Sequence, residues 1–371
     1  MKKIIYADNA ATTELDKVAF DTMTPWLLEY YGNPSQPYSF SREPKRALEK
    51  ARADIASCIN ADPEEIYFTS CGTEGDNFAI KGLGATCDTI ITTQFEHHAV
   101  LNPCKSLEKA GHKVIYLKPS MDGYITSDEL SKCQFGKTTL VSVMFANNEI
   151  GTIQPIKTLC ELAHTKGAFF HTDAVQAVGH VSIDVKKLGI DILTASAHKF
   201  NGPKGVGFMY IKRSMPLFSL LEGGSQENGV RAGTENVASI VGMSVALKKN
   251  CEALENTASY LNKLTELLID ELKQSTLSFV VNGGSNKLPG LISISFLDGD
   301  GEMLLHRLDL MGIIVSTGAA CDSKTTQISH VLKSIDLDKK YANGTIRISF
   351  SKNNTIEDAK NTAKAIIKIL Q

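Results

Sequence analysis

Residues 169–207 read FFHTDAVQAVGHVSIDVKKLGIDILTASAHKFNGPKGVG, and this stretch decides the fold of the chain. Strand-like runs cover 168–171 and 191–195, and a third, 207–211, follows directly. Upstream, short β-rich runs alternate with helical segments in the same manner. A repeated strand–helix–strand order predicts an α/β fold with a mostly parallel sheet covered by helices on both faces.

The same stretch carries an acid and a lysine at the ends of its strand-like runs. Asp173 and Gln176 follow the first run, and Lys199 follows the second, just before a turn of Asn, Gly and Pro. A lysine amine can form a Schiff base with an aldehyde, and an aspartate can keep a pyridinium nitrogen protonated so that the ring accepts electrons. An acid at the end of an interior strand also needs a partner for its charge. These residues therefore suggest a site for pyridoxal 5'-phosphate (PLP).

The spacing of apolar residues predicts the remaining elements on both sides of this stretch. Upstream, it predicts strands at 65–69, 89–92, 114–117 and 139–145 and helices at 15–31, 42–59, 73–82, 99–110, 127–132 and 156–166. Downstream, it predicts a long helix over 237–274 with a break near 255–258, strands at 292–296, 313–316 and 345–349, and helices at 301–310 and 355–370. We expect a large domain, residues 15–255, and a small α+β domain made of 1–14 and 256–371.

The composition excludes several classes of function. The 371 residues include 39 basic and 41 acidic side chains, so the net charge of −2 argues against a stable nucleic-acid surface or a polybasic membrane patch. No apolar run approaches the length of a membrane span or of a signal peptide, so a cytoplasmic location is expected. The eight cysteines form no C-x-x-C pair and have no metal spacing with the nine histidines, so no metal site is expected.

Loops that follow the predicted strands offer further polar groups. Gly72 and Thr73 open a helix, where free N–H groups suit a phosphate, although a plain helix cap is the alternative. His97 could stack on a flat ring or be an ordinary hydrogen-bonded loop histidine. Asn148 could hold a carboxylate or a ring hydroxyl, or belong to a simple turn. None of these signals is specific alone.

The second part of the chain supplies a cysteine and an arginine of interest. Cys321 follows the small residues Gly318, Ala319 and Ala320 and precedes a polar stretch, which describes an exposed loop. An exposed loop cysteine is a candidate for reactivity, whereas buried cysteines are usually inert. Arg347 lies in the middle of a predicted strand, and its guanidinium fork suits a carboxylate.

In combination, the motifs of this chain resemble those of the cysteine desulfurases of the class V aminotransferase family, specifically the NifS/IscS-like group. The resemblance runs in order through nearly the whole chain. The motifs that carry it are YADNAATT, YGNPS, EIYFTSCGTEGDNFAIKG, FEHHAV, NNEIGTIQPI, FHTDAVQAVG, SAHKFNGPKGVG, GGSQENGVRAGTENV, STGAAC and SHVL. It implies the PLP-dependent transferase fold type I, with the catalytic cysteine on a loop of the small domain.

The resemblance also implies a set of cofactor contacts. Lys199 is the implied Schiff-base lysine, and Asp173 pairs with the pyridine nitrogen. Gln176 contacts the ring hydroxyl, and His97 stacks on the ring. The implied phosphate contacts are Gly72, Thr73, Ser196 and His198, and Asn148 and Thr234 complete the cofactor-binding set. Thr234 is expected to reach the phosphate of the partner subunit's cofactor, which implies a homodimer.

The implied reaction is that of a cysteine desulfurase. L-Cysteine, held through its carboxylate by Asn148 and Arg347, becomes L-alanine, and Cys321 receives the sulfur as a persulfide. The catalytic residues are then Lys199, Cys321 and His97. The sulfur would pass to an acceptor such as an Fe–S scaffold protein or to tRNA thiolation, and Cys321 could hold an Fe–S cluster transiently.

Three alternatives stay open at this point. A selenocysteine lyase shares the scaffold and does not strictly need the loop cysteine. A PLP aminotransferase would use Asp173 and Lys199 and would keep its turnover after Cys321→Ala. A non-catalytic scaffold would bind partners and show no absorbance from a Schiff base.

Overall fold

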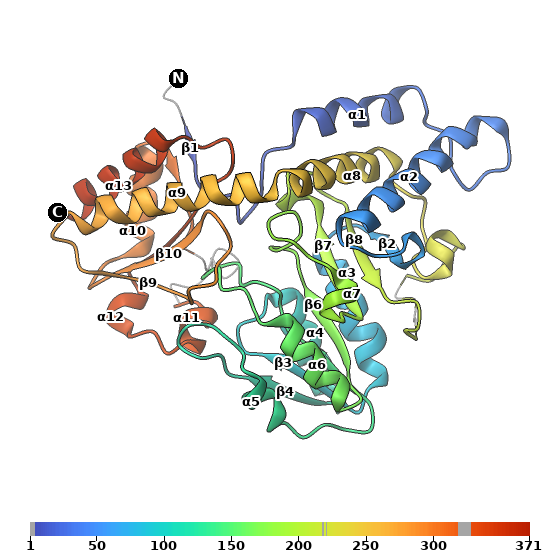
Figure 1. Ribbon diagram of the computed structural model, residues 1–371, viewed down its shortest axis with the longest axis horizontal. Coiled ribbons are helices and arrows are strands. Elements are labelled where there is room, and N and C mark those ends of the chain that lie inside the picture. Colours follow the sequence, from blue (N-terminus) through green and yellow to red (C-terminus); the bar gives the residue numbers. More distant parts are fainter. Residues whose placement is uncertain (1–3, 217–218, 220, 318–327) are drawn as a thin grey trace.

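The structure, a computed structural model, describes residues 4–216, 219, 221–317 and 328–371. It has a larger body around one sheet and a smaller body around another (Figure 1). Helices α8 (Val237–Glu252) and α9 (Leu254–Lys273) follow each other along both bodies. The predicted long helix is thus present, but it breaks at Ala253, slightly before the predicted 255–258. The first strand, β1 (Ile5–Tyr6), and the last helix, α13 (Ile356–Leu370), both lie on the smaller body.

The larger body contains a sheet of seven strands in the described part of the chain, in the order β2-β8-β7-β6-β5-β3-β4. The strands are β2 (Ile66–Thr69), β3 (Thr89–Thr93), β4 (Lys113–Leu117), β5 (Thr139–Ser142), β6 (Phe169–Asp173), β7 (Ile192–Ser196) and β8 (Gly207–Ile211). Neighbouring strands from β7 to β4 run parallel, while β8 runs antiparallel to β7 and β2. The predicted mostly parallel sheet is therefore confirmed.

Side chains that alternate along the strands feed two separate cores, one on each face of this sheet. On β3, Ile91 joins one apolar cluster and Ile90 the other, and Leu193 and Ile192 on β7 divide in the same way. A strand points successive side chains to opposite faces, so the two clusters mark both faces as buried. The helices that pack there include α1 (Lys17–Leu28), α2 (Arg42–Cys58), α3 (Gly72–Asn77), the π-helix η3 (Phe78–Leu83), α4 (His98–Lys109), α5 (Ser127–Ser131), α6 (Ile156–Thr165) and α7 (Val185–Leu188). The predicted helix over 73–82 is thus an α-helix followed by a π-helix.

The smaller body is built from both ends of the chain. Its strands are β1 (Ile5–Tyr6), β9 (Phe279–Val281), β10 (Leu291–Phe296), β11 (Ile313–Ile314) and β12 (Thr345–Ser349), and its helices include α10 (Gly301–Leu310), α11 (His330–Ser334), α12 (Lys339–Ala342) and α13 (Ile356–Leu370). Strand β10 lies between β12 and β9 in an antiparallel sheet, and β1 pairs with β11 in parallel. A separate apolar cluster joins these elements to α9. The domain limits 15–255 and 1–14 with 256–371 stay a prediction.

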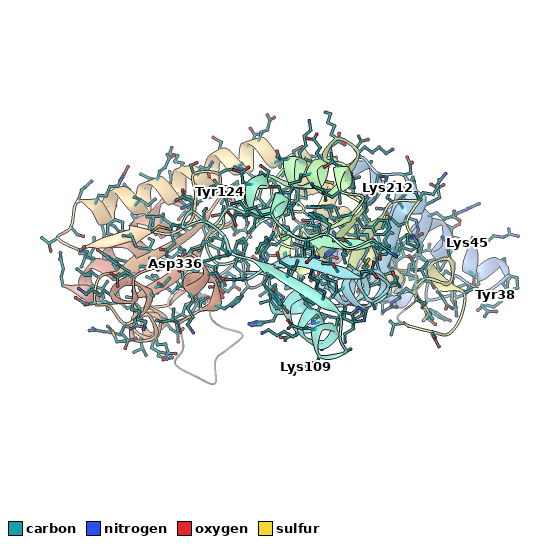
Figure 2. All side chains as sticks on the ribbon, turned by 90° about the horizontal axis from the view of Figure 1, so that it is seen from below. Tyr38, Lys45, Lys109, Tyr124, Lys212 and Asp336 are labelled. Atoms are coloured by element: carbon teal, nitrogen blue, oxygen red, sulfur yellow. The ribbon has the colours of Figure 1, made fainter. Side chains whose placement is uncertain are left out.

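Polar contacts join the two bodies near the middle of the molecule, where Figure 2 labels Tyr124 and Asp336. The Asn286 amide donates to the Tyr124 hydroxyl at 2.9 Å, and Lys118 Nζ lies 2.7 Å from an Asp336 carboxylate oxygen. Surface ion pairs of this kind contribute little free energy. The pocket described next, which receives groups from both bodies, depends on the same relative placement.

Candidate active site

A cavity of about 280 Å³ opens where the carboxyl ends of β6 and β7 meet the smaller body. Apart from Thr234 and Cys321, every site residue predicted from the sequence lines it. The lining residues are Ala10, Ala11, Cys71, Gly72, Thr73, Asp76, His97, Met144, Ala146, Asn148, Asp173, Val175, Gln176, Ser196, His198, Lys199 and Arg347. Chain topology explains this gathering, because the ends of parallel strands meet at one edge of a sheet.

Asp173 and Lys199 form the base of the pocket. Asp173 ends β6, and the turn η5 (Ala197–Lys199) follows β7, the neighbouring strand. The Val175 amide donates to Asp173 Oδ1 at 2.9 Å. Burial raises the pKa of Asp173 to about 6, while the Val175 N–H and the Lys199 charge act to lower it. A cation placed beside this carboxyl would therefore favour its charged form.

Lys199 reaches a segment that crosses from β1 to the larger body, residues 8–13, which we call the N-terminal strap. Lys199 Nζ donates to the carbonyl oxygens of Ala10 at 2.6 Å and Ala11 at 2.8 Å. Gln176 Nε2 donates to the same Ala10 carbonyl at 2.9 Å. The sequence motif YADNAATT contains the strap, but nothing in its pattern of small residues predicted contacts to the lysine.

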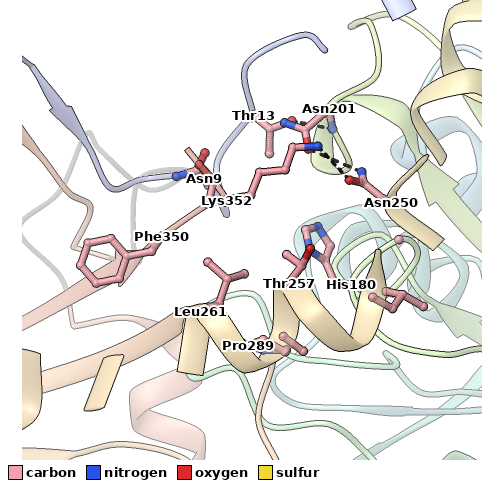
Figure 3. A pocket seen from close by; sticks show the side chains of 14 residues that line it. Asn9, Thr13, His180, Asn201, Asn250, Thr257, Leu261, Pro289, Phe350 and Lys352 are labelled. Carbon is pink, nitrogen blue, oxygen red and sulfur yellow. Dashed lines mark hydrogen bonds between the residues drawn. The ribbon is translucent and has the colours of Figure 1, made fainter. Parts of the chain in front are cut away.

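A second, smaller cavity of about 40 Å³ is lined by residues of both bodies (Figure 3). His180 lines it, and His180 Nε2 is 2.8 Å from the Lys199 carbonyl oxygen, to which it donates. Asn201 has a left-handed backbone with φ 63°, and its amide donates to the Thr13 hydroxyl at 2.8 Å. These bonds fix the backbone of the Lys199 turn against the strap.

His97 stands at the start of α4 with a defined tautomer. Its Nδ1 accepts from the Ala99 amide at 3.1 Å, so the neutral ring carries its proton on Nε2. Burial, and then the charges of Lys199 and His98, lower the pKa of His97 to about 4. The ring is therefore neutral at physiological pH, which suits stacking on a flat ring.

Small and hydroxyl-bearing residues line the end of the pocket beside α3. Ser196 is buried, and its Oγ has no hydrogen-bond partner among the described residues. A Cβ added to Gly72 would lie 2.5 Å from Val175 Cγ2. The backbone at residue 72 can therefore lie this close to Val175 only because glycine has no side chain. Burial, and then the Lys199 charge, lower the pKa of His198 to about 4. A buried hydroxyl without a partner indicates a ligand with hydrogen-bonding oxygens.

Arg347 brings the smaller body into the pocket. It lies on β12 and is buried, with Nη1 donating to the Asn148 carbonyl at 2.9 Å and Nη2 to Asp8 Oδ1 at 2.7 Å. Its Nε has no partner among the described residues. A guanidinium with an unused N–H at a pocket wall suits a carboxylate ligand. Asp8, which holds this arginine, was not predicted as a site residue.

Two predicted site residues stand apart from this geometry. Thr234 is exposed and is not among the described residues that line the pocket. Cys321 lies in 318–327, outside the described residues. No group of His, Cys, Asp and Glu side chains suited to a metal occurs in the part of the chain that the structure describes.

The residues present fit PLP on the evidence of their own geometry. A buried carboxyl that needs a cation, a lysine amine and a neutral imidazole surround one cavity. The unpartnered Ser196 hydroxyl lies at the end where a phosphate would be held. This set can bind a flat cationic ring with an anionic group at one end and a carboxylate at Arg347.

Comparison with known proteins gives full-length matches. The family model described as "Aminotransferase class-V" matches residues 5–361. The chain is 45% identical to "Cysteine desulfurase IscS" of Dictyoglomus turgidum, over 100% of this chain and 95% of that protein. It is 43% identical to "Cysteine desulfurase IscS" of Methanosarcina thermophila, over 100% of this chain and 92% of that protein.

Solved structures agree with these matches. A structure named "NIFS-LIKE PROTEIN" superposes with a TM-score of 0.93 at 38% identity, covering 99% of both chains. "SspA in complex with cysteine" superposes with a TM-score of 0.85 at 34% identity, covering 96% of this chain and 100% of that chain. Both the fold and the sequence are therefore similar to these proteins from end to end.

Proposed function

Since the chain belongs to the class V aminotransferase family and is a PLP-dependent cysteine desulfurase, we propose how its residues divide that reaction. The observation that supports the proposal most is the meeting of Asp173, Lys199 and Arg347 in one cavity. These groups come from two separate bodies: Asp173 and Lys199 end β6 and the turn after β7, and Arg347 lies in the middle of β12. Asp173 suits a pyridinium, Lys199 an aldehyde and Arg347 a carboxylate.

The base of the pocket holds the cofactor. When bound, PLP supplies a reactive aldehyde and a ring that accepts an electron pair. Lys199 would hold it covalently, and the Asp173 carboxylate would keep the ring nitrogen protonated. The neutral His97 ring would lie against the face of the cofactor. The proposed phosphate contacts are Gly72, Thr73, Ser196 and His198.

The substrate side of the pocket orients L-cysteine. Arg347 would bind the substrate carboxylate through its fork, with Asn148 beside it, and this contact sets which face of the substrate meets Lys199. Lys199 would then take the proton from Cα as a general base. The amine is already held at the pocket wall by two strap carbonyls, which limits the positions it can adopt.

Sulfur transfer is assigned to Cys321. Its thiolate would attack the substrate sulfur, forming an S–S bond as the Cβ–S bond breaks, with the electron pair of the broken bond staying on carbon. After protonation the products are L-alanine and a persulfide on Cys321. Support for this role comes from the motif STGAAC and from the family, since the residue itself lies outside the described structure.

A homodimer in the cytoplasm completes the proposal. Large apolar side chains are exposed on α1 and in the segment after it, which suits burial against a second copy; they include Val18, Phe20, Leu27, Leu28, Tyr31, Tyr38 and Phe40. Thr234 is exposed and would reach the phosphate in the partner's pocket. No helix in the described residues is long and apolar enough to cross a membrane.

The sulfur acceptor is proposed to be a protein, such as an Fe–S scaffold. The IscS name of the relatives from Dictyoglomus turgidum and Methanosarcina thermophila supports this class of acceptor. Pull-down of the persulfide-loaded enzyme with a purified scaffold, followed by mass spectrometry of the scaffold, would test the transfer. Sulfur that reaches only small thiols would contradict it.

Mass spectrometry of Cys321 after incubation with L-cysteine tests the catalytic assignment. We expect a gain of one sulfur atom on Cys321 that disappears in Lys199→Ala. Cys321→Ala should bind L-cysteine but release almost no L-alanine. Full L-alanine release by Cys321→Ala would contradict the sulfur-accepting role of Cys321. Conversion of L-cysteine to its keto acid would favour an aminotransferase, and turnover of selenocysteine alone would identify a selenocysteine lyase.

A further inference from the structure

Three carboxyl groups are buried together beneath the pocket. Asp173 is 6% exposed, Asp76 on α3 is 1% exposed, and Glu96 in the segment after β3 is 0% exposed. The proposed mechanism uses Asp173 and has no task for Asp76 or Glu96. Three charges cannot all be kept in such a place without cations, because burying an unpaired carboxylate is very costly. The three carboxyls therefore cannot all be ionised, and at least one of them must carry a proton.

Glu96 has a structural task that needs no charge. Its Oε1 accepts from the Thr93 hydroxyl at 2.8 Å and from the Met144 amide at 2.9 Å. These bonds join the segment after β3 to the segment after β5. Burial raises the pKa of Glu96 to about 8, so it is mostly protonated at neutral pH. Glu96 is thus a buried and mostly protonated carboxyl with which the protonation of Asp76 can be compared.

Asp76 lies beside a buried histidine. His171 Nε2 is 3.6 Å from Asp76 Oδ1, and His171 also contacts the Ser142 hydroxyl at 2.8 Å and the Thr194 hydroxyl at 3.2 Å. Burial lowers the pKa of His171 to about 3, so this ring carries no charge. Asp76 Oδ1 has no hydrogen-bond partner among the described residues.

The influences on Asp76 all favour its protonated form, with one exception. Burial raises its pKa well above the usual range, and the charge of Asp173 acts in the same direction. The Thr194 hydroxyl opposes them. Because Oδ1 has no donor beside it, a proton added there breaks no hydrogen bond.

Asp173 differs from Asp76 in the two contacts that favour an anion. It accepts from the Val175 amide, and it feels the positive charge of Lys199. When two close carboxyls share one proton, the proton resides on the carboxyl whose surroundings stabilise a negative charge less. That carboxyl is Asp76, which also lines the cavity.

We propose that Asp76 stays protonated, so that Asp173 is the single anion at the base of the pocket. The proposal rests on the proposed role of Asp173 toward the ring nitrogen. An ionised Asp76 would add a second negative charge beside Asp173 and raise the pKa of Asp173. A protonated Asp76 leaves one carboxylate for one pyridinium, so the buried site is neutral overall.

Infrared spectroscopy tests this in the unmodified holoenzyme at neutral pH. With aspartate labelled by carbon-13, the carbonyl band of a protonated aspartic acid should appear at the labelled frequency. The Glu96 band should stay at the unlabelled frequency, and Glu96→Gln should remove it. We expect the labelled band to vanish in Asp76→Asn. A holoenzyme without a labelled carboxylic-acid band would overturn the proposal, and this outcome requires no variant to fold.

The pH dependence of PLP uptake by the apoprotein gives an independent measure. Uptake should weaken at acid pH as Asp173 becomes protonated. If Asp76 is already neutral, Asp76→Asn leaves the midpoint where it is in the wild type. If Asp76 is charged, the substitution removes a neighbouring negative charge, lowers the pKa of Asp173 and moves the midpoint down by about one pH unit or more. Such a shift contradicts the proposal.

Asp173→Asn separates this proposal from the assignment it rests on. We expect Asp173→Asn to lose about 100-fold or more in PLP affinity or in turnover, while Asp76→Asn stays within about threefold of the wild type. If Asp76→Asn folds and loses as much as Asp173→Asn, then Asp76 acts as an anion and the proposal is wrong. If Asp173→Asn itself behaves like the wild type, the role of Asp173 fails instead.

Discussion

The base of the pocket and its rim are built by different means. The base, with Asp173 and Lys199, comes from the ends of two neighbouring parallel strands, whose register places Asp173 opposite Thr194. The rim joins Asp8 of the strap to Arg347 of β12, residues separated by 339 positions in the chain. The geometry of the base is therefore set by one sheet, whereas the rim forms only when the two bodies are correctly placed relative to each other. Changes at the base should affect the cofactor, and changes at the rim should affect the substrate.

Lys199→Ala should have the largest effect, because it removes both the covalent attachment and the proposed base. We expect L-alanine formation to fall by about 10³-fold or more. The absorbance of bound PLP in the visible region should shift or vanish as well. Lys204→Ala, at an exposed lysine in the next turn, is the matched control and should keep both signals. Normal turnover by Lys199→Ala would contradict the assignment of the catalytic chemistry to the base of the pocket.

Arg347→Lys tests the rim alone. The lysine keeps the positive charge but lacks the planar fork, so kcat/KM for L-cysteine should fall about 10- to 100-fold, mainly through KM. PLP affinity, measured by titration of the apoprotein, should stay close to that of the wild type. A loss of PLP affinity as large as the loss of kcat/KM would show that base and rim are not separate in function.

Gly72→Ala probes how tightly the base is packed. The added Cβ would lie 2.5 Å from Val175 Cγ2, so the two segments must move apart. Overpacking of this kind costs about 1–3 kcal/mol, and we expect PLP affinity to fall by a corresponding factor of about 5 to 150. Gly72→Ala combined with Val175→Ala should recover most of it. No recovery in the double variant would place the effect on the backbone of residue 72 rather than on packing.

The pH dependence should also differ between base and rim. Burial raises the pKa of Asp173 to about 6 in the protein without cofactor, and only its anion pairs with the pyridinium. PLP affinity of the apoprotein should thus be complete above that pH and fall about tenfold for each unit below it. A guanidinium does not change its charge in this range, so the carboxylate contact at the rim should add no acid limb to KM for L-cysteine. Equal affinity for PLP at pH 5 and pH 7 would contradict the assignment of Asp173.

The same division explains how much could be predicted from the sequence. Asp173, Gln176 and Lys199 follow strands that periodicity and propensity make visible, so their common location follows from local pattern and the rule for parallel strands. Strand β8 was found within its observed limits, but its antiparallel direction depends on pairing that no local pattern encodes.

Contacts between distant segments were harder to foresee. Asp8 sits in a stretch of small polar residues, and its β-bridge to Ser349 of β12 brings it to Arg347. Asp76 lies on a short helix among Gly, Asn and Glu, where an acid usually faces water, and its burial arises from packing against Thr194 and His171. The position of the helix break at Ala253 was missed for a related reason, since neither glycine nor proline marks it.

The strap gives the pocket an order of assembly during synthesis. A ribosome releases the N-terminal residues first, yet β1 pairs with β11 and Asp8 meets Arg347 close to the end of the chain. The sheet that forms the base needs only residues up to Ile211. A nascent chain could thus complete its base well before its rim. A nascent chain that has not yet reached Arg347 would then lack the clamp for the carboxylate of L-cysteine.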